Sequence, residues 1–182
     1  MKLLLALFTL LPFTSFGQDI KSGDILGKLS EKMEVEGLFY VEFSVNILNN
    51  STGTDENESG RGWVNGDKYF VSFGDNTIIS DGEKYWTVVK EEKTVYEADA
   101  DEDDDDILNP KKLMTIWENG FKHKYGNELT INDEKVHLIY LYPMDSGAVD
   151  YHTVVIYISI SNNELKKILL KMKDGTRMTY QI

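Results

Sequence analysis

Hydrophobic and polar residues alternate along much of this chain, and alternation with a period of two predicts β-strands. The clearest run spans residues 38–48, where Tyr40, Glu42, Ser44 and Asn46 share one side. The opposite side carries only large apolar residues: Phe39, Val41, Phe43, Val45 and Ile47. We expect this strand to place its apolar side against a core.

Residues 59–97 contain five short β-favouring runs separated by turn pairs. The pairs are Asn65-Gly66, Gly74-Asp75, Asp81-Gly82 and Glu91-Glu92. Asn-Gly and Asp-Gly tolerate the positive φ of tight hairpins, so this segment is predicted to be an antiparallel meander.

Several meander strands carry apolar or aromatic side chains on both faces. Tyr69, Val71 and Phe73 alternate with Phe70, and Trp86 and Val88 alternate with Tyr85, Thr87 and Val89. Two explanations are open: burial on both sides, or helices against the inner face and an outer face decorated with aromatic rings. Residues 49–59, just before the meander, contain no apolar residue and are predicted to form a mobile hairpin loop.

Two segments show the three- and four-residue spacing of amphipathic helices. The first spans 19–36, with Ile25, Leu26, Leu29 and Met33 on one side and Gly37 placed to end it. The second spans 111–119, follows Asn109-Pro110, and presents Leu113, Met114, Ile116 and Trp117. Residues 121–182 return to alternating strands, which gives about ten strands and two helices in all.

The first 17 residues have the features of a cleavable signal peptide. Lys2 precedes an apolar run too short for a permanent anchor, and Ser15-Phe16-Gly17 places small residues at the cleavage site. We therefore expect an exported protein, soluble in the periplasm if the source is a Gram-negative bacterium, with residues 18–182 as a single domain. No cysteine is present near the cut, so lipid attachment there is excluded.

Composition narrows the classes of function. The formal charge of −12 argues against nucleic acid and anionic membrane as main partners, and the absence of cysteine excludes thiolate nucleophiles and thiolate metal sites. The run 99–106 has alternate carboxylates, but Asp104 and Pro110 stand where a calcium loop requires glycine and glutamate, so a solvated helix-capping loop is favoured. His123, His137 and His152 lie on separate predicted strands without zinc-site spacing.

No motif of acyl-transfer or glycosidase chemistry stands out, so we expect a protein that is not an enzyme. The surplus of apolar and aromatic residues on sheet faces has two explanations: a cavity for a long apolar ligand, or a core filled by the chain's own side chains.

Four segments of the sequence resemble the LolA family of periplasmic lipoprotein carriers, in its Bacteroidetes-like form. They are Gly60-Arg61-Gly62-Trp63-Val64, Ile79-Ser80-Asp81-Gly82-Glu83-Lys84-Tyr85-Trp86, Asn109-Pro110-Lys111-Lys112-Leu113, and Lys173-Asp174-Gly175-Thr176-Arg177-Met178-Thr179-Tyr180. The order of predicted elements is also similar along nearly the whole mature chain. One departure is Gly66, which stands where proteobacterial carriers have an arginine that helps fasten the lid.

The resemblance implies an unclosed antiparallel β-barrel with helices as a lid over its concave apolar face. It implies a carrier that takes lipoprotein acyl chains from an inner-membrane lipoprotein-releasing ABC transporter to an outer-membrane acceptor, as a monomer and without a cofactor. The alternative is an envelope sensor of the same fold that binds lipid or lipoprotein without transporting it.

The expected acyl-chain cavity draws on residues from six parts of the sheet: Phe39, Val41, Phe43, Val45, Trp63, Val71, Phe73, Trp86, Val88, Ile156, Ile158, Ile168 and Leu170. The expected lid residues are Ile25, Leu29, Met33, Leu113, Met114, Ile116 and Trp117.

Overall fold

One antiparallel sheet and one long helix make up the described part of the protein. The computed structural model describes residues 16–99 and 113–182. The helix is α1 (Phe16–Glu36). The strands are β1 (Leu38–Asn49), β2 (Thr54–Asn65), β3 (Lys68–Phe73), β4 (Asn76–Asp81), β5 (Lys84–Val89), β6 (Thr94–Asp99), β7 (Phe121–Ile131), β8 (Glu134–Pro143), β9 (Tyr151–Ser159), β10 (Leu165–Met172) and β11 (Arg177–Gln181).

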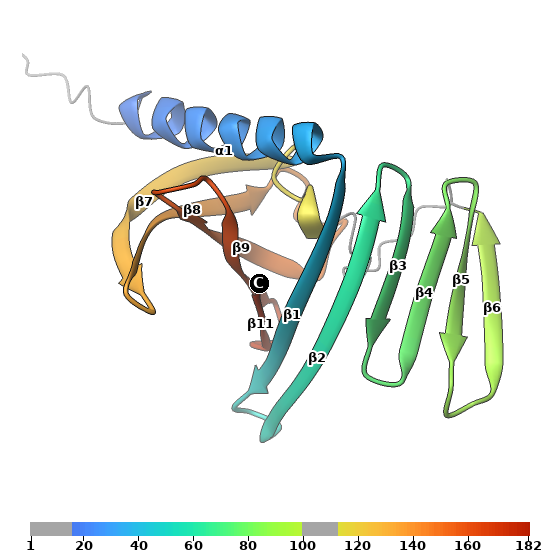
Figure 1. The fold of residues 1–182 in the computed structure, drawn as a ribbon. Coiled ribbons are helices and arrows are strands. Elements are labelled where there is room, and N and C mark those ends of the chain that lie inside the picture. The colour runs from blue at the N-terminus through green and yellow to red at the C-terminus, as the bar shows by residue number, and fades with distance from the viewer. Residues whose placement is uncertain (1–15, 100–112) are drawn as a thin grey trace, which may run out of the picture.

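The chain enters the sheet at its middle and leaves it there. Strand order is β6-β5-β4-β3-β2-β1-β11-β10-β9-β8-β7, so β1–β6 run outward to one edge and β7–β11 return from the other. The halves join where Ser44–Leu48 of β1 pair with Arg177–Gln181 of β11. In the described part of the chain, β6 and β7 are the two edge strands and do not pair with each other. The predicted unclosed barrel is therefore confirmed (Figure 1).

The two halves of the sheet differ in curvature. The ladders from β7 to β10 contain register shifts, one of them between Tyr125 and Glu128, and these strands curve beneath α1 (Figure 1). The pairings among β1 to β6 run in continuous register, and this half extends beyond the helix as an arm. Bulges bend a sheet and increase its twist, which accounts for the difference.

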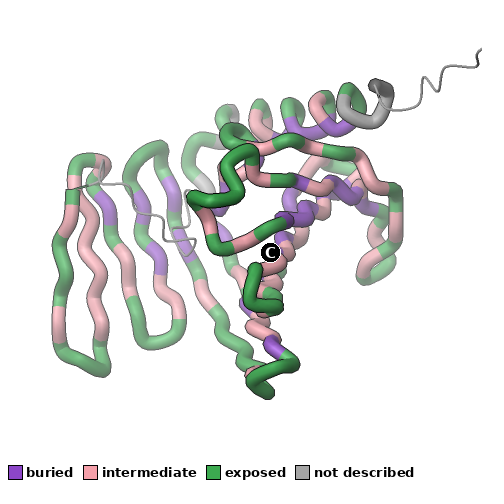
Figure 2. Tube along the Cα trace, turned by 180° about the vertical axis from the view of Figure 1, so that it is seen from behind, coloured by how far each residue is buried: buried purple, intermediate pink, exposed green. Residues whose placement is uncertain are grey.

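The main core lies between α1 and the curved half, where buried positions gather in Figure 2. Ile25, Leu26 and Leu29 of the helix pack there. The strand residues of this core are almost completely buried: Ile139, Leu141, Val154, Ile156, Ile158, Ile168 and Leu170. The arm has a small core of its own, made of Val64, Tyr69 and Val71.

The first predicted helix is confirmed and begins at Phe16, three residues earlier than expected. Gly37 ends it with a positive φ of 54° and donates its N–H to the Met33 carbonyl at 3.1 Å. The proposed signal peptide lies outside the described residues except for Phe16 and Gly17, which begin α1. No helix in the described part of the chain is both long and apolar enough to cross a membrane.

Two predictions about elements were wrong. Residues 49–59 are not one long loop, because β2 begins at Thr54 and pairs with β1 along its full length. An exposed polar stretch can join a sheet when a long neighbour supplies its backbone partners, and residues 55–59 are all exposed. The second helix is also shorter than expected: among described residues only 113 and 114 are helical, and turns follow to Gly120.

Candidate functional site

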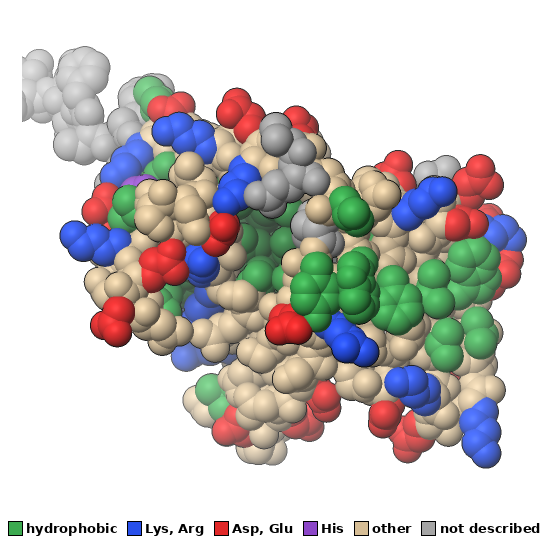
Figure 3. Space-filling view, viewed as in Figure 1, with side chains coloured by type: hydrophobic (Ala, Val, Ile, Leu, Met, Phe, Trp, Pro, Cys, Tyr) green, Lys and Arg blue, Asp and Glu red, His purple; other side chains and the backbone are tan. Residues whose placement is uncertain are grey.

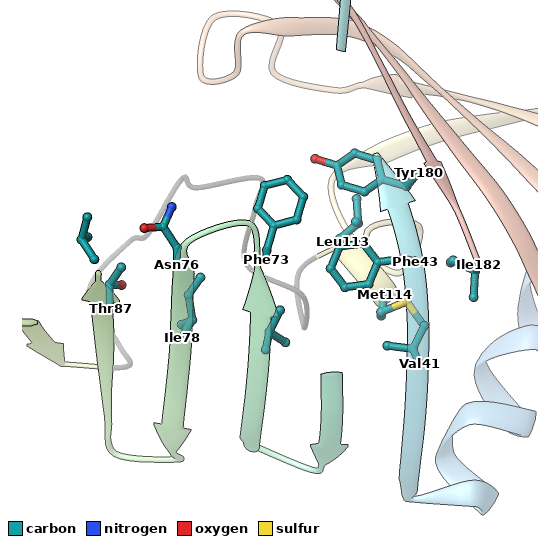
Figure 4. A pocket seen from close by; sticks show the side chains of 12 residues that line it. Val41, Phe43, Phe73, Asn76, Ile78, Thr87, Leu113, Met114, Tyr180 and Ile182 are labelled. Atoms are coloured by element: carbon teal, nitrogen blue, oxygen red, sulfur yellow. The ribbon is translucent and has the colours of Figure 1, made fainter. Parts of the chain in front are cut away.

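An apolar pocket opens on the inner face of the arm, beside the main core. Its volume is about 140 Å³, and β1, β3, β4 and β5 form its floor. The lining residues are Val41, Phe43, Val71, Phe73, Asn76, Ile78, Thr87, Val89, Leu113, Met114, Tyr180 and Ile182 (Figure 4). Period-two alternation brings all the floor residues to one face.

Two glycines of β2 shape the floor. Gly60 and Gly62 face inward, and a Cβ at Gly60 would lie 2.4 Å from the Phe43 ring. At Gly62 it would lie 2.8 Å from a Val71 methyl group. Because β2 presents no side chain at these two positions, its neighbours lie across it and form a continuous apolar surface.

Leu113 and Met114 form the roof and lie beside Phe43 in Figure 4. The segment that carries them is tied to α1, since the Trp117 indole Nε1 donates to the Ser30 hydroxyl at 2.9 Å. Trp117 is itself buried in the main core. The roof segment and helix are therefore linked through Trp117, three residues beyond Met114.

Helix α1 is held at both ends. Near its start, the Ser22 hydroxyl lies 2.7 Å from His123 Nδ1 on β7. Near its end, the Lys32 ammonium donates to Glu164 Oε1 and to the Asn162 carbonyl, both at 3.1 Å. Hydrogen bonds from Lys166 and from Lys32 lower the pKa of Glu164 to about 2. The carboxylate therefore stays charged at neutral pH and keeps this end of the helix attached.

A second cavity of about 260 Å³ adjoins the pocket. It lies between the end of α1, the first half of β1 and the turn before β10, where Figure 3 shows a hollow. Val41, Met114 and Ile182 line both cavities. Met114 therefore stands between them, on an unbranched side chain that adapts readily to a new shape.

The structure brings part of the predicted cavity together. Val41, Phe43, Val71 and Phe73 line the pocket. Val45 is buried in the main core beside it. Ile156, Ile158, Ile168 and Leu170 lie beneath α1 and are fully buried, so this part of the expected cavity is a filled core.

Three predicted cavity residues lie on the opposite, outer face: Trp63, Trp86 and Val88. The register pairs Trp63 with Phe70 and Trp86 with Ile79, which leaves Tyr85, Thr87 and Val89 facing inward. The correction has a physical reason, because residues on both faces of these strands are apolar and composition alone does not show which face is inside. The side chain of Phe39 lies outside the described part of the structure.

The predicted lid residues contribute to the main core, and several of them also line a cavity. Leu113 and Met114 form the roof, and Met33 lines the second cavity. All seven lie in or against the main core, and Leu29 also lines the second cavity.

The sequence-based list omitted six lining residues: Asn76, Ile78, Thr87, Val89, Tyr180 and Ile182. The signal for Ile78 was the two-residue turn at Gly74-Asp75, which fixes the register of β3 on β4 and places Ile78 opposite Val71. The same reasoning continues to Thr87, which pairs with Ile78.

The pocket wall is almost entirely apolar, with polar groups only on Asn76, Thr87 and Tyr180. Each histidine has a local partner elsewhere: His123 meets Ser22, His137 meets Tyr125, and His152 meets Thr153. Across residues 16–99 and 113–182, no three His, Asp or Glu residues gather where they could hold a metal ion. Asp101, Asp103 and Asp105 of the acidic run lie outside the described residues.

Gly66, at the position of the expected family arginine, occupies the turn between β2 and β3 with a φ of 59°. No atom lies within 4 Å of the position a Cβ would take. Contacts that fasten the roof segment and helix in this chain include Trp117 to Ser30, Lys32 to Glu164 and Ser22 to His123.

The sequence matches no family model, and no curated protein matches it significantly. Similar solved structures exist at low identity. LprF from Mycobacterium bovis is 12% identical with a TM-score of 0.54, covering 90% of this chain and 92% of that one. A domain described as that of an outer-membrane lipoprotein-sorting protein, from Vibrio parahaemolyticus, is 9% identical with a TM-score of 0.50, covering 87% and 88%.

A LolA superfamily protein from Nitrosomonas europaea is also similar, at 13% identity and a TM-score of 0.45, with 87% of this chain and 90% of that chain covered. At such identities the likeness concerns the fold. The chain thus has the open, helix-covered β-sheet that a lipoprotein-sorting domain and LprF share with it.

Proposed function

We propose that this protein is a periplasmic carrier that binds lipoprotein acyl chains in the roofed pocket and shuttles them from the inner to the outer membrane. The observation that carries the proposal is an apolar pocket under a roof that a hydrogen bond ties to α1. We further propose that the role is binding and not catalysis, since the wall offers apolar contact and only three polar side chains.

The pocket is contracted in this structure. Its volume of about 140 Å³ is less than half the lower end of the range of small-molecule sites, roughly 300–1,000 Å³. An acyl chain therefore requires displacement of Leu113 and Met114. A shift of Met114 would join the pocket to the second cavity and lengthen the apolar space.

Exchange of one apolar surface for another makes this opening feasible. Leu113 and Met114 are buried against the floor in the closed state, at 8% and 9% exposure. An entering acyl chain covers the same floor, so the cost of exposing the roof is offset by burial at roughly 25 cal/mol per Å². Delivery then depends on the difference in affinity between the open and closed states.

The proposed partners are an inner-membrane lipoprotein-releasing ABC transporter as donor and an outer-membrane acceptor. The chain's net charge of −12 suits a donor with a basic or neutral contact surface.

Adjacent valines on β5 give a sharp test. Val89 lines the pocket and Val88 faces outward on the same strand. Val89→Asp should weaken binding of a fluorescent triacylated lipopeptide at least about tenfold, because a carboxylate would be buried against the acyl chain. Val88→Asp is the matched control and should bind like the parent.

Equal binding by both variants would remove the pocket from the proposal. A transfer assay from donor to acceptor vesicles then separates carrier from sensor. Binding that never leads to transfer, with normal lipoprotein sorting in depleted cells, would favour the sensor.

A further inference from the structure

A row of large apolar side chains crosses the outer face of the arm. It consists of Tyr40, Trp63, Phe70, Ile79 and Trp86, which we call the outer stripe (Figure 3). The first four are between 37% and 48% exposed, and Trp86 is half-buried. A contiguous apolar surface of this kind marks an interaction site more often than isolated exposed residues do.

The outer stripe is continuous because its members are direct cross-strand neighbours. Tyr40 pairs with Trp63, Trp63 with Phe70, Phe70 with Ile79, and Ile79 with Trp86. At about 4.8 Å between strands, the row is about 19 Å long. Ring centroids lie 4.9 Å apart for Tyr40 and Trp63 and 5.6 Å apart for Trp63 and Phe70.

The polar atoms of the Tyr40 and Trp86 rings already have hydrogen-bond partners within the chain. The Tyr40 hydroxyl donates to Glu42 at 2.6 Å, and the Trp86 indole donates to Glu97 at 2.9 Å. Arg61 lies over the Trp63 ring at 5.8 Å. The rings are thus held in place with their apolar faces outward, and a partner would lose little side-chain entropy on binding them.

Charges border the outer stripe on both sides and nearly cancel. One side carries Lys68, Asp81, Lys84 and Asp99 in alternating sign along successive strands. Together with Arg61, Glu42 and Glu97, the border contains three cations and four carboxylates. Its net charge is therefore −1, whereas the whole chain carries −12. This border suits neither an anionic lipid surface nor a strongly basic protein.

We infer that the outer stripe is the interface for a second copy of this chain, packed face to face about a two-fold axis parallel to β3 and β4. An axis between these strands places Lys68 opposite the partner subunit's Asp81, and Trp63 opposite the partner subunit's Trp86. At these positions the surface is complementary to itself, as an isologous dimer requires. The expectation of a monomer did not take account of this face.

The area predicts a weak, reversible dimer. Six strands at about 4.8 Å and three rows of side chains cover roughly 600 Å² per copy. Stable interfaces bury about 800 Å² per partner, so we expect a micromolar dissociation constant.

Sedimentation velocity over the micromolar to millimolar range tests the inference. Phe70→Lys, at the centre of the outer stripe, should weaken dimerisation at least about tenfold. Tyr142→Lys is the matched control, because Tyr142 is a similarly exposed ring on β8, 40% exposed and outside the arm. Unchanged thermal midpoints establish that both variants fold.

Charge reversal supplies a second test of the dimer. Lys68→Glu places a carboxylate opposite the partner's Asp81 and should weaken the dimer about tenfold, whereas Lys90→Glu, an exposed lysine in the β5–β6 turn, should not. In a Trp117→Phe background, emission from Trp63 and Trp86 should shift to shorter wavelength as the dimer forms.

A protein that stays monomeric throughout the range overturns the inference. A dimer that Phe70→Lys and Tyr142→Lys weaken equally also overturns it. Binding of the outer stripe to zwitterionic or anionic vesicles without self-association overturns it as well.

Discussion

Gly60 shows how one missing side chain shapes the pocket. The Phe43 ring occupies the space that a Cβ would need, and the Ser72 carbonyl lies 2.9 Å from the same point. Neither backbone nor a packed ring yields easily. The Gly-Arg-Gly sequence at 60–62 therefore keeps the floor smooth, while Arg61 faces the opposite side.

Gly60→Ala should destabilise the fold by about 1–3 kcal/mol through overpacking against Phe43. Gly27→Ala is the control: its Cβ would meet nothing within 4 Å on the exposed side of α1, and it should stabilise the helix by about 1 kcal/mol. Urea unfolding of the two variants measures both values. Equal changes in the free energy of unfolding for Gly60→Ala and Gly27→Ala would mean that the Phe43 ring moves aside freely.

Trp117→Phe should ease opening of the roof. The change removes the 2.9 Å hydrogen bond to Ser30 and keeps most of the ring. Loss of about 1 kcal/mol would raise the open population roughly fivefold, and lipopeptide association should accelerate in stopped-flow fluorescence. Trp86→Phe loses a comparable bond to Glu97 far from the roof and should leave the rate unchanged.

At the scale of elements, α1 both contributes to the main core and covers the curved half of the sheet. Its buried side completes the main core, and Lys32 near its end meets Glu164 and Asn162 before β10. This ionic contact is local, so it responds to pH without involving the core.

Acid should weaken the Lys32 contact in a defined window. The pKa of Glu164 is lowered from 4.5 to about 2 by hydrogen bonds from Lys166 and Lys32, so its stabilising effect is complete above pH 4.5 and is lost as pH falls toward 2. The difference in unfolding free energy between parent and Glu164→Gln should therefore shrink across that window. Urea unfolding of the two proteins from neutral to acid pH measures this difference, and a difference that stays constant across the window would contradict the prediction.

Much of this arrangement could be predicted from the sequence, because turn pairs and alternation determine strands locally. Strands β3 to β6 were predicted within a residue or two, and α1 ends at Gly37 as expected. The polar first half of β2 could not be predicted, since only pairing with β1 makes residues 54–59 a strand.

The candidate site was predicted less completely than the fold. Strand β1 has one apolar side, so Val41 and Phe43 were assigned correctly to the inner face. Strand β5 is apolar on both sides, and there the larger ring of Trp86 was mistaken for the inner residue. Only the register with β4 shows that Thr87 faces the pocket.

At the scale of the whole molecule, packing is divided unequally. The curved half holds the large core beneath α1, whereas the arm has three buried core residues and an incompletely filled pocket. Local stability should follow this division.

Amide hydrogen exchange should resolve the two halves. We expect amides of β4 to exchange at least about tenfold faster than those of β9, because opening the arm exposes far less buried apolar surface. Mass spectrometry of peptides from the two strands measures the ratio under native conditions. Equal protection would show that the sheet opens only as one cooperative unit.

The filled half and the pocketed half share a single sheet yet keep separate tasks. Ile78, Thr87 and Val89 line the pocket outside the main core, so substitutions at these three positions leave the packing beneath α1 intact. Under the proposed carrier function, such positions allow the bound cargo to be varied while the main core continues to fold.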